Sequence, residues 1–373
     1  MLDAILYGYS ITGITPKPDS IFYPKNLSEL WDIVESAVKN DRYLLIKGYR
    51  TSIIRIDNLS NLTKGIYIIS TKNLNNITIT NNSLTVSSGI KWHTLFSLLL
   101  ESKSRPAIYP LFSIKSSIGG LIATNNMQFY DGKYGLANYL VKISLFSSDG
   151  LITVTSRKRD IIGSLGCLGL IGEVELSPPD NTEYDVDIHV NSKSESNVIY
   201  VYRSLSSMDI PLRLATLYKF NEKQYSLYLI TSLRRISELE LSHILSKLSR
   251  EVNVKYELVR DPKLFIDVHR RFLYTFINSL HNLKACIVYI SGLQSESIST
   301  FIFNPQCYVF DLLGGKGIFI FKKLVNISEV DASIIYQYEV SSMRASIRGS
   351  AINRLNSLKS KYDVKLVFPS VRS

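Results

Sequence analysis

The sequence contains few cysteines, and its three cysteines are widely spaced. They are Cys167, Cys286 and Cys307, and no two of them form a Cys-x-x-Cys motif. Zinc ribbons and iron–sulfur clusters need several closely spaced cysteines, so this chain cannot build either on its own. A chain of 373 residues buries enough apolar surface to fold without disulfides. We therefore expect a protein of a reducing compartment.

Long apolar runs and leader sequences are absent as well. No stretch approaches the roughly 20 apolar residues that span a bilayer. Residues 1–8 lack the basic region of a signal peptide. Histidine is also scarce, and His189, His243 and His281 lack the spacing of metal ligands. These absences predict a cytoplasmic protein with no membrane span and no metal site.

Acidic residues are outnumbered, since 32 Asp and Glu face 43 Lys and Arg and leave a formal charge of +11. Such a charge suits nucleic acid, a membrane surface, an anionic cofactor or simple solubility. Nucleic-acid binding predicts clustered cations with interleaved aromatic residues. Here the cations are dispersed, and residues 156–159 form the only dense basic run. The pattern disfavours a nucleic-acid partner.

The first half of the chain alternates helix and strand patterns. Residues 28–39 predict a helix capped by Ser28, and residues 43–46 predict a buried strand. A second helix is expected over residues 92–100, and hairpin turns are expected at residues 81–82 and 148–150. This mixture indicates an α+β fold.

The pattern of predicted helices and strands changes after Pro178-Pro179, which we interpret as a domain boundary. Residues 181–260 follow the order strand, helix, strand, strand, helix, strand, which predicts a separate α+β unit with an antiparallel sheet. Residues 315–320 suit either an exposed edge strand for docking or an ordinary cap strand, and we favour the second. Residues 329–361 return to a helical pattern.

Three glycine-rich loops stand out. The first, over residues 47–52, combines cations and hydroxyls directly after a buried strand, which suits an anion cradle or an ordinary turn. The second, over residues 116–125, allows close approach of a ligand or simply tight packing. The third, over residues 166–172, suits a ligand loop or the entry to a core strand. None of them is a P-loop or opens a Rossmann helix, so kinases and Rossmann dehydrogenases are disfavoured.

The order of these loops resembles the flavin-binding domain of the vanillyl-alcohol oxidase-like, or PCMH-type, flavoproteins. The resemblance covers residues 20–180, and its main segments are KGYRTSI (47–53), TVSSGIKWHTL (85–95), SSIGGLIATN (116–125), KYGLANYLV (133–141) and GCLGLIGEVELSP (166–178). It implies two α+β subdomains with FAD extended between them. Because Thr51 stands where some members carry a histidine bound covalently to FAD, the resemblance implies noncovalent FAD. The implied FAD-binding residues are Lys47, Gly48, Tyr49, Arg50, Thr51, Ser52, Pro110, Ser117, Gly119, Gly120, Ala123, Thr124, Asn125, Gly135, Gly166, Gly169 and Ile171.

The second half resembles the FAD-binding subunits of glycolate oxidase, especially the shorter one. The similar segments are residues 211–215, 264–272 and 358–370. The resemblance implies an FAD domain over residues 1–180 and a smaller α+β cap over residues 181–345. It also implies a segment over residues 346–373 that returns to the FAD domain.

The glycolate oxidase resemblance also implies a reaction and partners. The substrate would be a small 2-hydroxy acid such as glycolate or D-lactate, and the partners a second flavoprotein subunit and an iron–sulfur subunit. Met127 and Gln128 depart from the family, because they replace small residues after the second loop. This departure motivates an alternative, namely a noncatalytic or electron-relaying subunit that supports a catalytic partner.

Oxidation of a 2-hydroxy acid needs a base near the hydroxyl and a cation for the carboxylate. His269 and Arg270 in the segment DVHRRF are the best candidates, and the alternative is a basic helix face in solvent. His93 follows Trp92 in the FAD domain and is expected to be structural.

Overall fold

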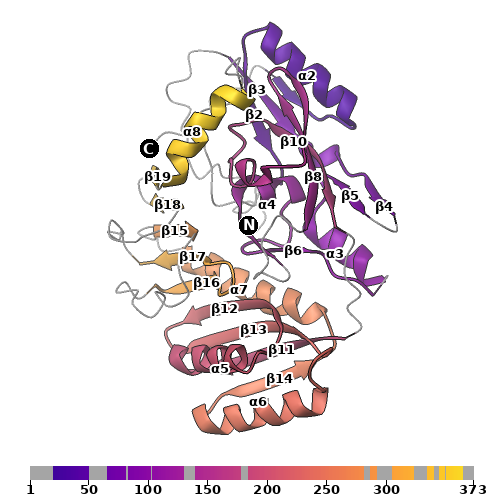
Figure 1. Ribbon diagram of the computed structural model, residues 1–373. Helices are drawn as coiled ribbons and strands as arrows, with labels where there is room; N and C mark the ends of the chain where they lie inside the picture. Colours follow the sequence, from indigo (N-terminus) through magenta and orange to yellow (C-terminus); the bar gives the residue numbers. More distant parts are fainter. Residues whose placement is uncertain are drawn as a thin grey trace.

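The chain folds into three main β-sheets flanked by helices (Figure 1). The structure is a computed structural model. It describes residues 20–49, 65–80, 83–101, 103–129, 139–177, 184–280, 286–291, 305–322, 334–339, 344–348 and 350–363.

The first sheet is small and parallel. It has the order β1-β3-β2 and consists of β1 (Ser20–Phe22), β2 (Tyr43–Lys47) and β3 (Ile66–Ser70). Helix α2 (Leu27–Lys39) packs against this subdomain through the buried Leu30, Val34 and Ala37, whose spacing places them on one helix face. The expected cap at Ser28 is wrong. Asn26 caps the helix instead, because its side chain accepts a hydrogen bond from the Glu29 N–H at 2.9 Å.

The second sheet is antiparallel and has the order β4-β5-β10-β8-β9. Both expected hairpins are confirmed, since β4 pairs with β5 and β8 pairs with β9. The helices α3 (Trp92–Glu101) and α4 (Ile118–Thr124) complete this subdomain, together with a short ladder of β6 and β7. Its other elements are η1 (Thr71–Asn73), β4 (Ile77–Ile79), β5 (Leu84–Ser87), β6 (Ile108–Pro110), β7 (Met127–Phe129), β8 (Leu140–Ser147), β9 (Gly150–Val154), η4 (Lys158–Asp160) and β10 (Leu170–Leu176).

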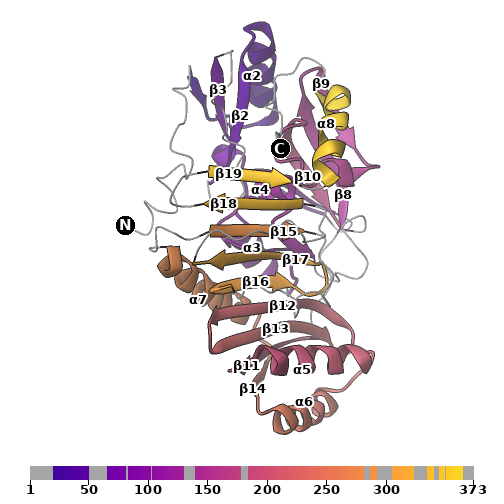
Figure 2. The same ribbon diagram turned by 90° about the vertical axis from the view of Figure 1, so that its left-hand side faces the viewer.

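The third sheet, the cap sheet, has nine antiparallel strands in the order β14-β11-β13-β12-β16-β17-β15-β18-β19. Figure 2 shows these strands stacked across the molecule, with α5 and α6 beside one end. The expected order over residues 181–260 is confirmed. The elements are β11 (Asp185–Ser192), α5 (Glu195–Ser207), β12 (Leu212–Asn221), β13 (Gln224–Ser232), α6 (Glu238–Val252), β14 (Lys255–Val259), α7 (Lys263–Leu280), β15 (Cys286–Ser291), β16 (Cys307–Asp311), β17 (Lys316–Phe321), β18 (Ile334–Glu339) and β19 (Arg344–Arg348).

The two faces of the cap sheet pack into different cores. Alternate strand residues point to opposite faces. Leu217, Leu227 and Phe310 lie in a core with α5 and α6, whereas Tyr218 and Val309 lie in a core with α7. That second core continues without interruption into the antiparallel subdomain of the first half. The sequence predicts a separate cap unit. In the structure, the cap instead shares a core with the first half of the chain.

The C-terminal part differs from the sequence expectation. Residues 329–361 are not helical throughout, because β18 and β19 extend the cap sheet before α8 (Ser350–Tyr362) begins. β-Branched and aromatic residues at 334–338 favour a strand, and β18 finds a partner in β15. The expected boundary at residue 345 falls within β19. Strand β17 lies between β16 and β15, so it is an interior strand of the cap sheet.

Helix α8 returns to the first half of the chain. The ammonium of Lys359 is buried and donates to the Cys167 carbonyl oxygen at 3.1 Å and to Asp363 Oδ2 at 2.6 Å. The end of α8 lies next to β9, where Lys361 and Tyr362 line a hollow together with residues of that strand (Figure 2). The observed architecture is the expected α+β fold of two subdomains and an antiparallel cap, and this prediction is confirmed.

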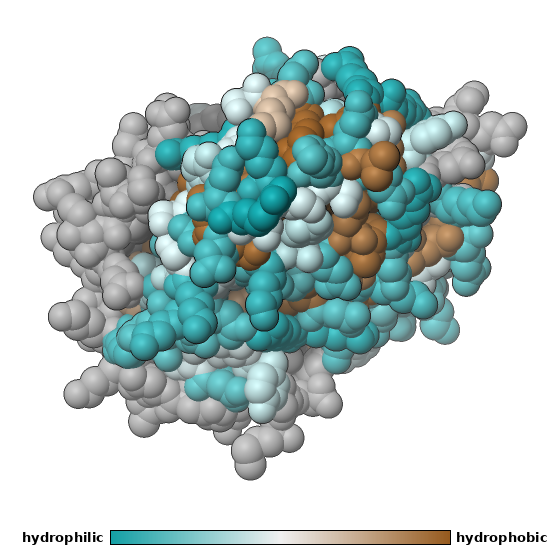
Figure 3. Space-filling view, turned by 90° about the horizontal axis from the view of Figure 1, so that it is seen from below, coloured by the Kyte–Doolittle hydropathy of each residue, from teal (hydrophilic) through white to brown (hydrophobic). Residues whose placement is uncertain are grey.

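The surface seen from below in Figure 3 is mostly hydrophilic, with hydrophobic patches among the polar side chains. On the cap helices, Tyr200 of α5 and Leu239 of α6 are exposed. Scattered exposed apolar residues are normal for a folded protein, so we assign no docking surface here. Among the described residues, no helix is long and apolar enough to cross a membrane, and no group of three acidic, histidine or cysteine side chains is placed to hold a metal.

Candidate functional site

The first glycine loop begins where β2 ends, at the edge of the parallel sheet. Gly48 directly follows Lys47, the last residue of β2. A Cβ atom at Gly48 would lie 2.7 Å from the hydroxyl oxygen of Ser117, closer than real Cβ atoms approach other atoms. The absence of a side chain at Gly48 therefore lets the first loop meet the second.

The second loop forms the start of α4 and lies against a serine-rich turn. Ser117 caps the helix and accepts a hydrogen bond from the Gly120 N–H at 3.2 Å. The Gly119 N–H donates to the Ser88 carbonyl oxygen at 2.9 Å, and a Cβ at Gly119 would lie 2.6 Å from the Ser88 Cβ. Gly119 is thus required by a close approach of two backbone segments.

The turn directly before the third loop bonds to the second loop, and the third loop itself begins next to the end of β2, where the first loop starts. The Gly163 N–H donates to the Ile122 carbonyl oxygen at 3.0 Å, and the Leu165 N–H donates to the Ala123 carbonyl oxygen at 2.7 Å. At Gly166 a Cβ would lie 3.5 Å from the Ile46 side chain on β2. The three loops that the sequence singled out therefore converge, although they are far apart along the chain.

Three of the remaining predicted residues lie around the end of α4. Thr124 donates its hydroxyl to the Gly120 carbonyl oxygen at 2.7 Å, and Asn125 ends the helix in a left-handed conformation with φ of 52°. Pro110 pairs with Met127 in the β6–β7 ladder.

The last two of the predicted FAD-binding residues that the structure describes lie beside β8. Gly169 approaches the Phe146 carbonyl oxygen, and Ile171 pairs with Leu145. Arg50, Thr51, Ser52 and Gly135 lie outside the described residues.

Cations gather at the side chain of Tyr49, next to Gly48. The Lys91 ammonium lies 4.6 Å from the centre of the Tyr49 ring, and the Lys72 ammonium lies 5.7 Å from it. The Tyr49 hydroxyl donates to the Lys72 carbonyl oxygen at 3.4 Å. Lys91 also forms a backbone bridge with Ser117. Positive charge therefore surrounds the junction of the first two loops, where it would attract phosphate groups.

Hydroxyl groups line the same junction. The six residues are small and buried, and they are Ser70, Thr71, Ser87, Ser88, Ser116 and Ser117. The hydroxyl of Ser88 has no hydrogen-bond partner among the described residues. Buried hydroxyls normally have partners, so this donor suits a ligand rich in acceptors. A dinucleotide such as FAD, with its pyrophosphate and ribose oxygens, fits this set of donors and the glycine-flanked backbone.

Sequence reasoning missed Ser88, Lys72 and Lys91 as site residues. Ser88 lies in TVSSG (85–89), a segment that the resemblance included without assigning it a role. The run of serines ending in Gly89 was the available signal. The two lysines had no local signal, because their shared position around Tyr49 depends on the packing of η1 and α3.

His269 lies in the middle of α7 and is completely buried. Its Nε2 atom lies 2.7 Å from the Phe112 carbonyl oxygen, to which it donates, and its Nδ1 atom lies 3.3 Å from the Tyr218 hydroxyl. The ring stacks on Phe265. Burial lowers the pKa of His269 to about 4. His269 is thus a neutral histidine of the aromatic core.

The predicted partner Arg270 points elsewhere. Its side chain is 67% exposed, and its guanidinium lies 3.9 Å from the exposed carboxylate of Asp267. The structure therefore does not bring Arg270 and His269 together around one substrate position. His93 is half-buried, and burial together with the nearby Lys91 lowers its pKa.

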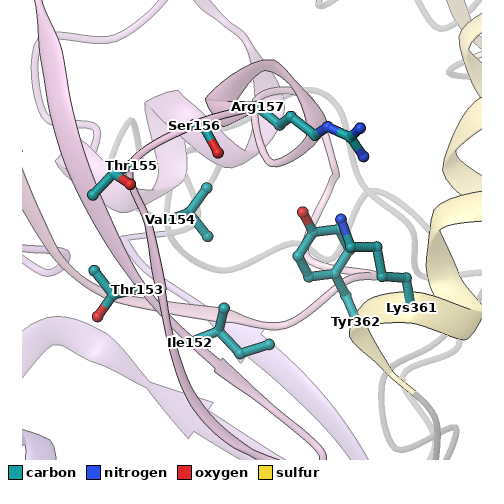
Figure 4. A pocket seen from close by; sticks show the side chains of 8 residues that line it. All are labelled: Ile152, Thr153, Val154, Thr155, Ser156, Arg157, Lys361 and Tyr362. Carbon is teal, nitrogen blue, oxygen red and sulfur yellow. The ribbon is translucent and has the colours of Figure 1, made fainter.

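A small hollow lies where β9 meets the end of α8 (Figure 4). Its volume is about 230 Å³, and its lining includes Arg157, Lys361 and Tyr362. Figure 4 shows the hydroxyl of Tyr362 pointing into the hollow and Arg157 above it. None of the predicted FAD-binding or catalytic residues lines it.

Comparisons with known proteins agree with this geometry. Residues 18–156 match the family described as FAD binding domain. Two crystal forms of alkyldihydroxyacetonephosphate synthase share the fold. The first gives a TM-score of 0.69 at 14% identity, over 97% of this chain and 78% of that one. The second gives a TM-score of 0.65 at 14% identity, over 93% and 75%. No curated protein sequence matches this chain.

Residues 18–156 therefore form the part of the chain that matches a PCMH-type FAD-binding domain. This domain match indicates an FAD-linked enzyme of the oxidoreductase type, and the likeness to the synthase structures shows the fold. The FAD prediction is confirmed at the level of the domain.

Proposed function

We propose that this chain binds FAD noncovalently at the junction of its three glycine loops and oxidises a small 2-hydroxy acid such as glycolate or D-lactate. The observation that carries the proposal is the meeting of Gly48 with Ser117 and of Gly119 with Ser88, whose buried hydroxyl has no partner among the described residues. When bound, FAD supplies the redox chemistry, because its isoalloxazine ring accepts a hydride from a substrate C–H bond.

The chain's own residues bind and orient the dinucleotide. Gly48 and Gly119 let the loops close on one another beside it, and the hydroxyls of Ser88 and its neighbours donate to its oxygen atoms. Lys72 and Lys91 offset phosphate charge. Threonine offers no ring nitrogen for attachment to the flavin, so Thr51 supports noncovalent binding.

The proposal includes partners that receive the electrons. The three cysteines are too few and too far apart to hold an iron–sulfur cluster. A second flavoprotein subunit and an iron–sulfur subunit, as implied by the glycolate oxidase resemblance, would supply that path. A cytoplasmic location stays a prediction from the sequence.

The absorption spectrum of the purified chain tests the proposal. We expect flavin bands that remain in solution after acid precipitation of the protein, because noncovalent FAD is released on unfolding. Anaerobic glycolate or D-lactate should then bleach the flavin, and acetate, which has no hydroxyl group, should not. A colourless protein that takes up no FAD would overturn the proposal.

A second function is an electron-relaying or noncatalytic subunit. The burial of His269 and the outward position of Arg270 favour it, because no base and cation of that segment face a shared substrate. A yellow protein that neither acid bleaches, and that copurifies with a second flavoprotein and a cysteine-rich protein, would support this alternative over the first.

A further inference from the structure

Residues 125–128, which follow α4, are held by three strands of the cap sheet, β12, β15 and β17. We call this contact the seam. The Tyr289 hydroxyl on β15 donates to the Asn125 carbonyl oxygen at 2.9 Å. The Thr216 hydroxyl on β12 donates to Gln128 Oε1 at 2.8 Å. The Lys316 ammonium on β17 donates to Asn125 Oδ1 and to the Met127 carbonyl oxygen, both at 3.0 Å. In these four bonds every donor comes from the cap.

Lys316 is an unusual residue for this position. It lies inside the sheet between β16 and β15, and only 8% of it is exposed. Burying an ammonium group is costly unless acceptors replace water. Lys316 reaches its acceptors across 191 and 189 residues of sequence. The buried carboxylate of Asp311 on β16 attracts it, while burial lowers the pKa of Lys316 to about 8.

Helix α4 connects the seam directly to the proposed FAD site. Asn125 is the C-cap of α4, and Gly119 and Gly120 lie at the other end of this seven-residue helix. The buried polar atoms Asn126 Oδ1 and Gln128 Nε2 have no partner among the described residues, so they add no bonds that would hold the segment in place. Within the first half of the chain, the same segment pairs with β6, and the Asn126 carbonyl oxygen accepts from the Leu111 N–H at 3.2 Å. The cap donors add the polar contacts that tie the end of α4 to the cap sheet.

We infer that Lys316 is a positioning residue for FAD binding: together with Tyr289 it clamps α4 to the cap sheet and couples FAD occupancy of the glycine loops to order in the cap. The inference rests on the proposed FAD site. Because Lys316 holds both the side chain of Asn125 and the main chain of Met127, its loss releases the end of α4 at two points.

Hydrogen exchange on the full chain, measured by mass spectrometry with and without FAD, tests this coupling. In the wild type, FAD should slow exchange in residues 118–129 and also in β15 and β17. In Lys316→Met the protection of β15 and β17 should disappear, and the Kd for FAD should rise about tenfold, as expected for loss of hydrogen bonds from a charged donor. Lys316→Gln keeps two N–H donors and should recover part of the affinity.

The matched control is Lys322→Met, which removes the same charge from a side chain that is 63% exposed just after β17. We expect its FAD affinity and exchange pattern to equal those of the wild type. Tyr289→Phe removes the second donor to Asn125 without changing the charge, and it should weaken FAD binding in the same direction.

The outcomes separate the inference from the proposed function. A wild type that binds no FAD overturns the proposed function. A wild type that binds FAD, with unchanged affinity and cap protection in Lys316→Met, overturns the inference alone. Without FAD, residues 118–129 should exchange faster in Lys316→Met than in Lys322→Met, and equal rates would also overturn the inference.

Discussion

In the glycine loops, backbone approaches backbone, and the contacts depend on residues that have no side chain. At the junction between the FAD domain and the cap, charged and aromatic side chains pair across long stretches of sequence. Gly119 meets Ser88 through a main-chain hydrogen bond, whereas Arg105 binds Asp187 across 82 residues in a fully buried setting. The loops thus provide a shape for a ligand, and the junction fixes how the cap is placed over it.

The difference predicts opposite responses to substitution. A change in the loops should reduce FAD binding more than stability, because the loops form the proposed FAD site. A change at the junction should reduce stability first, because an unpaired buried charge remains. Four experiments test this contrast.

The largest effect is expected at the buried ion pair. Arg105 Nη1 lies 3.0 Å from Asp187 Oδ1, a second guanidinium nitrogen bonds the other carboxylate oxygen, and Tyr228 donates to the same carboxylate. Arg105→Met leaves Asp187 buried without its cation, and we expect a loss of about 3–5 kcal/mol in the free energy of unfolding. Urea denaturation measures it.

The control for this prediction is Arg260→Met. Arg260 pairs with Glu238 at 2.6 Å, but both side chains are about half exposed. Exposed pairs contribute about 0–1 kcal/mol, so this variant should unfold close to the wild type. Equal losses in the two variants would show that burial does not determine how much an ion pair contributes to the free energy of unfolding.

The second-largest effect is expected at low pH, where protonation of His269 should destabilise the fold. Its folded pKa of about 4 lies below the ordinary value of 6.5, because burial disfavours the charged ring. The unfolded chain therefore binds the proton more readily, and stability falls as the pH drops from 6.5 towards 4, by about 3 kcal/mol. Burial raises the pKa of Asp185 and Asp311 to about 6, and these two carboxyls change stability in the opposite direction. The loss due to His269 is therefore the difference between wild type and His269→Gln in urea unfolding between pH 7 and 4.5.

His269→Gln should flatten part of that pH dependence, since glutamine can still donate to the Phe112 carbonyl oxygen and does not titrate. His189, whose pKa burial also lowers to about 4, should leave a residual slope. His243→Gln, at an exposed position of α6, should keep the full slope. A wild-type slope in His269→Gln would contradict the burial argument.

The contrast also explains what the sequence reveals. Close backbone approach requires glycine, so Gly48 and Gly119 can be identified in the sequence. The resemblance could be recognised from the order of the glycine-rich loops. The hairpins around residues 81–82 and 148–150 were predictable from another local signal, the turn-forming residues between their strands. No local pattern marks Lys316 or Arg105, because their partners are brought near only by the complete fold. His269 misled the prediction, because a basic helix segment looks the same whether its histidine faces solvent or an aromatic core.

The third prediction concerns a glycine in the loops. A methyl group at Gly119 would meet the Ser88 Cβ at 2.6 Å and its carbonyl oxygen at 3.1 Å, so α4 must move away from the serine turn. We expect Gly119→Ala to weaken FAD binding about tenfold or more, with a smaller loss of stability of about 1–2 kcal/mol. Flavin fluorescence titration and urea unfolding measure the two effects. Gly150→Ala is the control: nothing lies within 4 Å of the new methyl group, but the φ of 140° strains alanine, so stability should fall while FAD affinity stays unchanged.

The smallest effect is expected at the cations around Tyr49. Lys91→Met removes one of two ammonium groups that face this ring, while the backbone bridge between Lys91 and Ser117 does not depend on the side chain. We expect the Kd for FAD to rise about two- to fivefold at low salt, and the difference from wild type to shrink at high salt, because exposed charges are screened. Lys103→Met, beyond α3, is the control and should bind FAD like the wild type. A salt-independent loss in Lys91→Met would mean that the lysine acts by packing on Tyr49. The loops would then hold their ligand by shape alone, and the contrast with the charged junction would be sharper still.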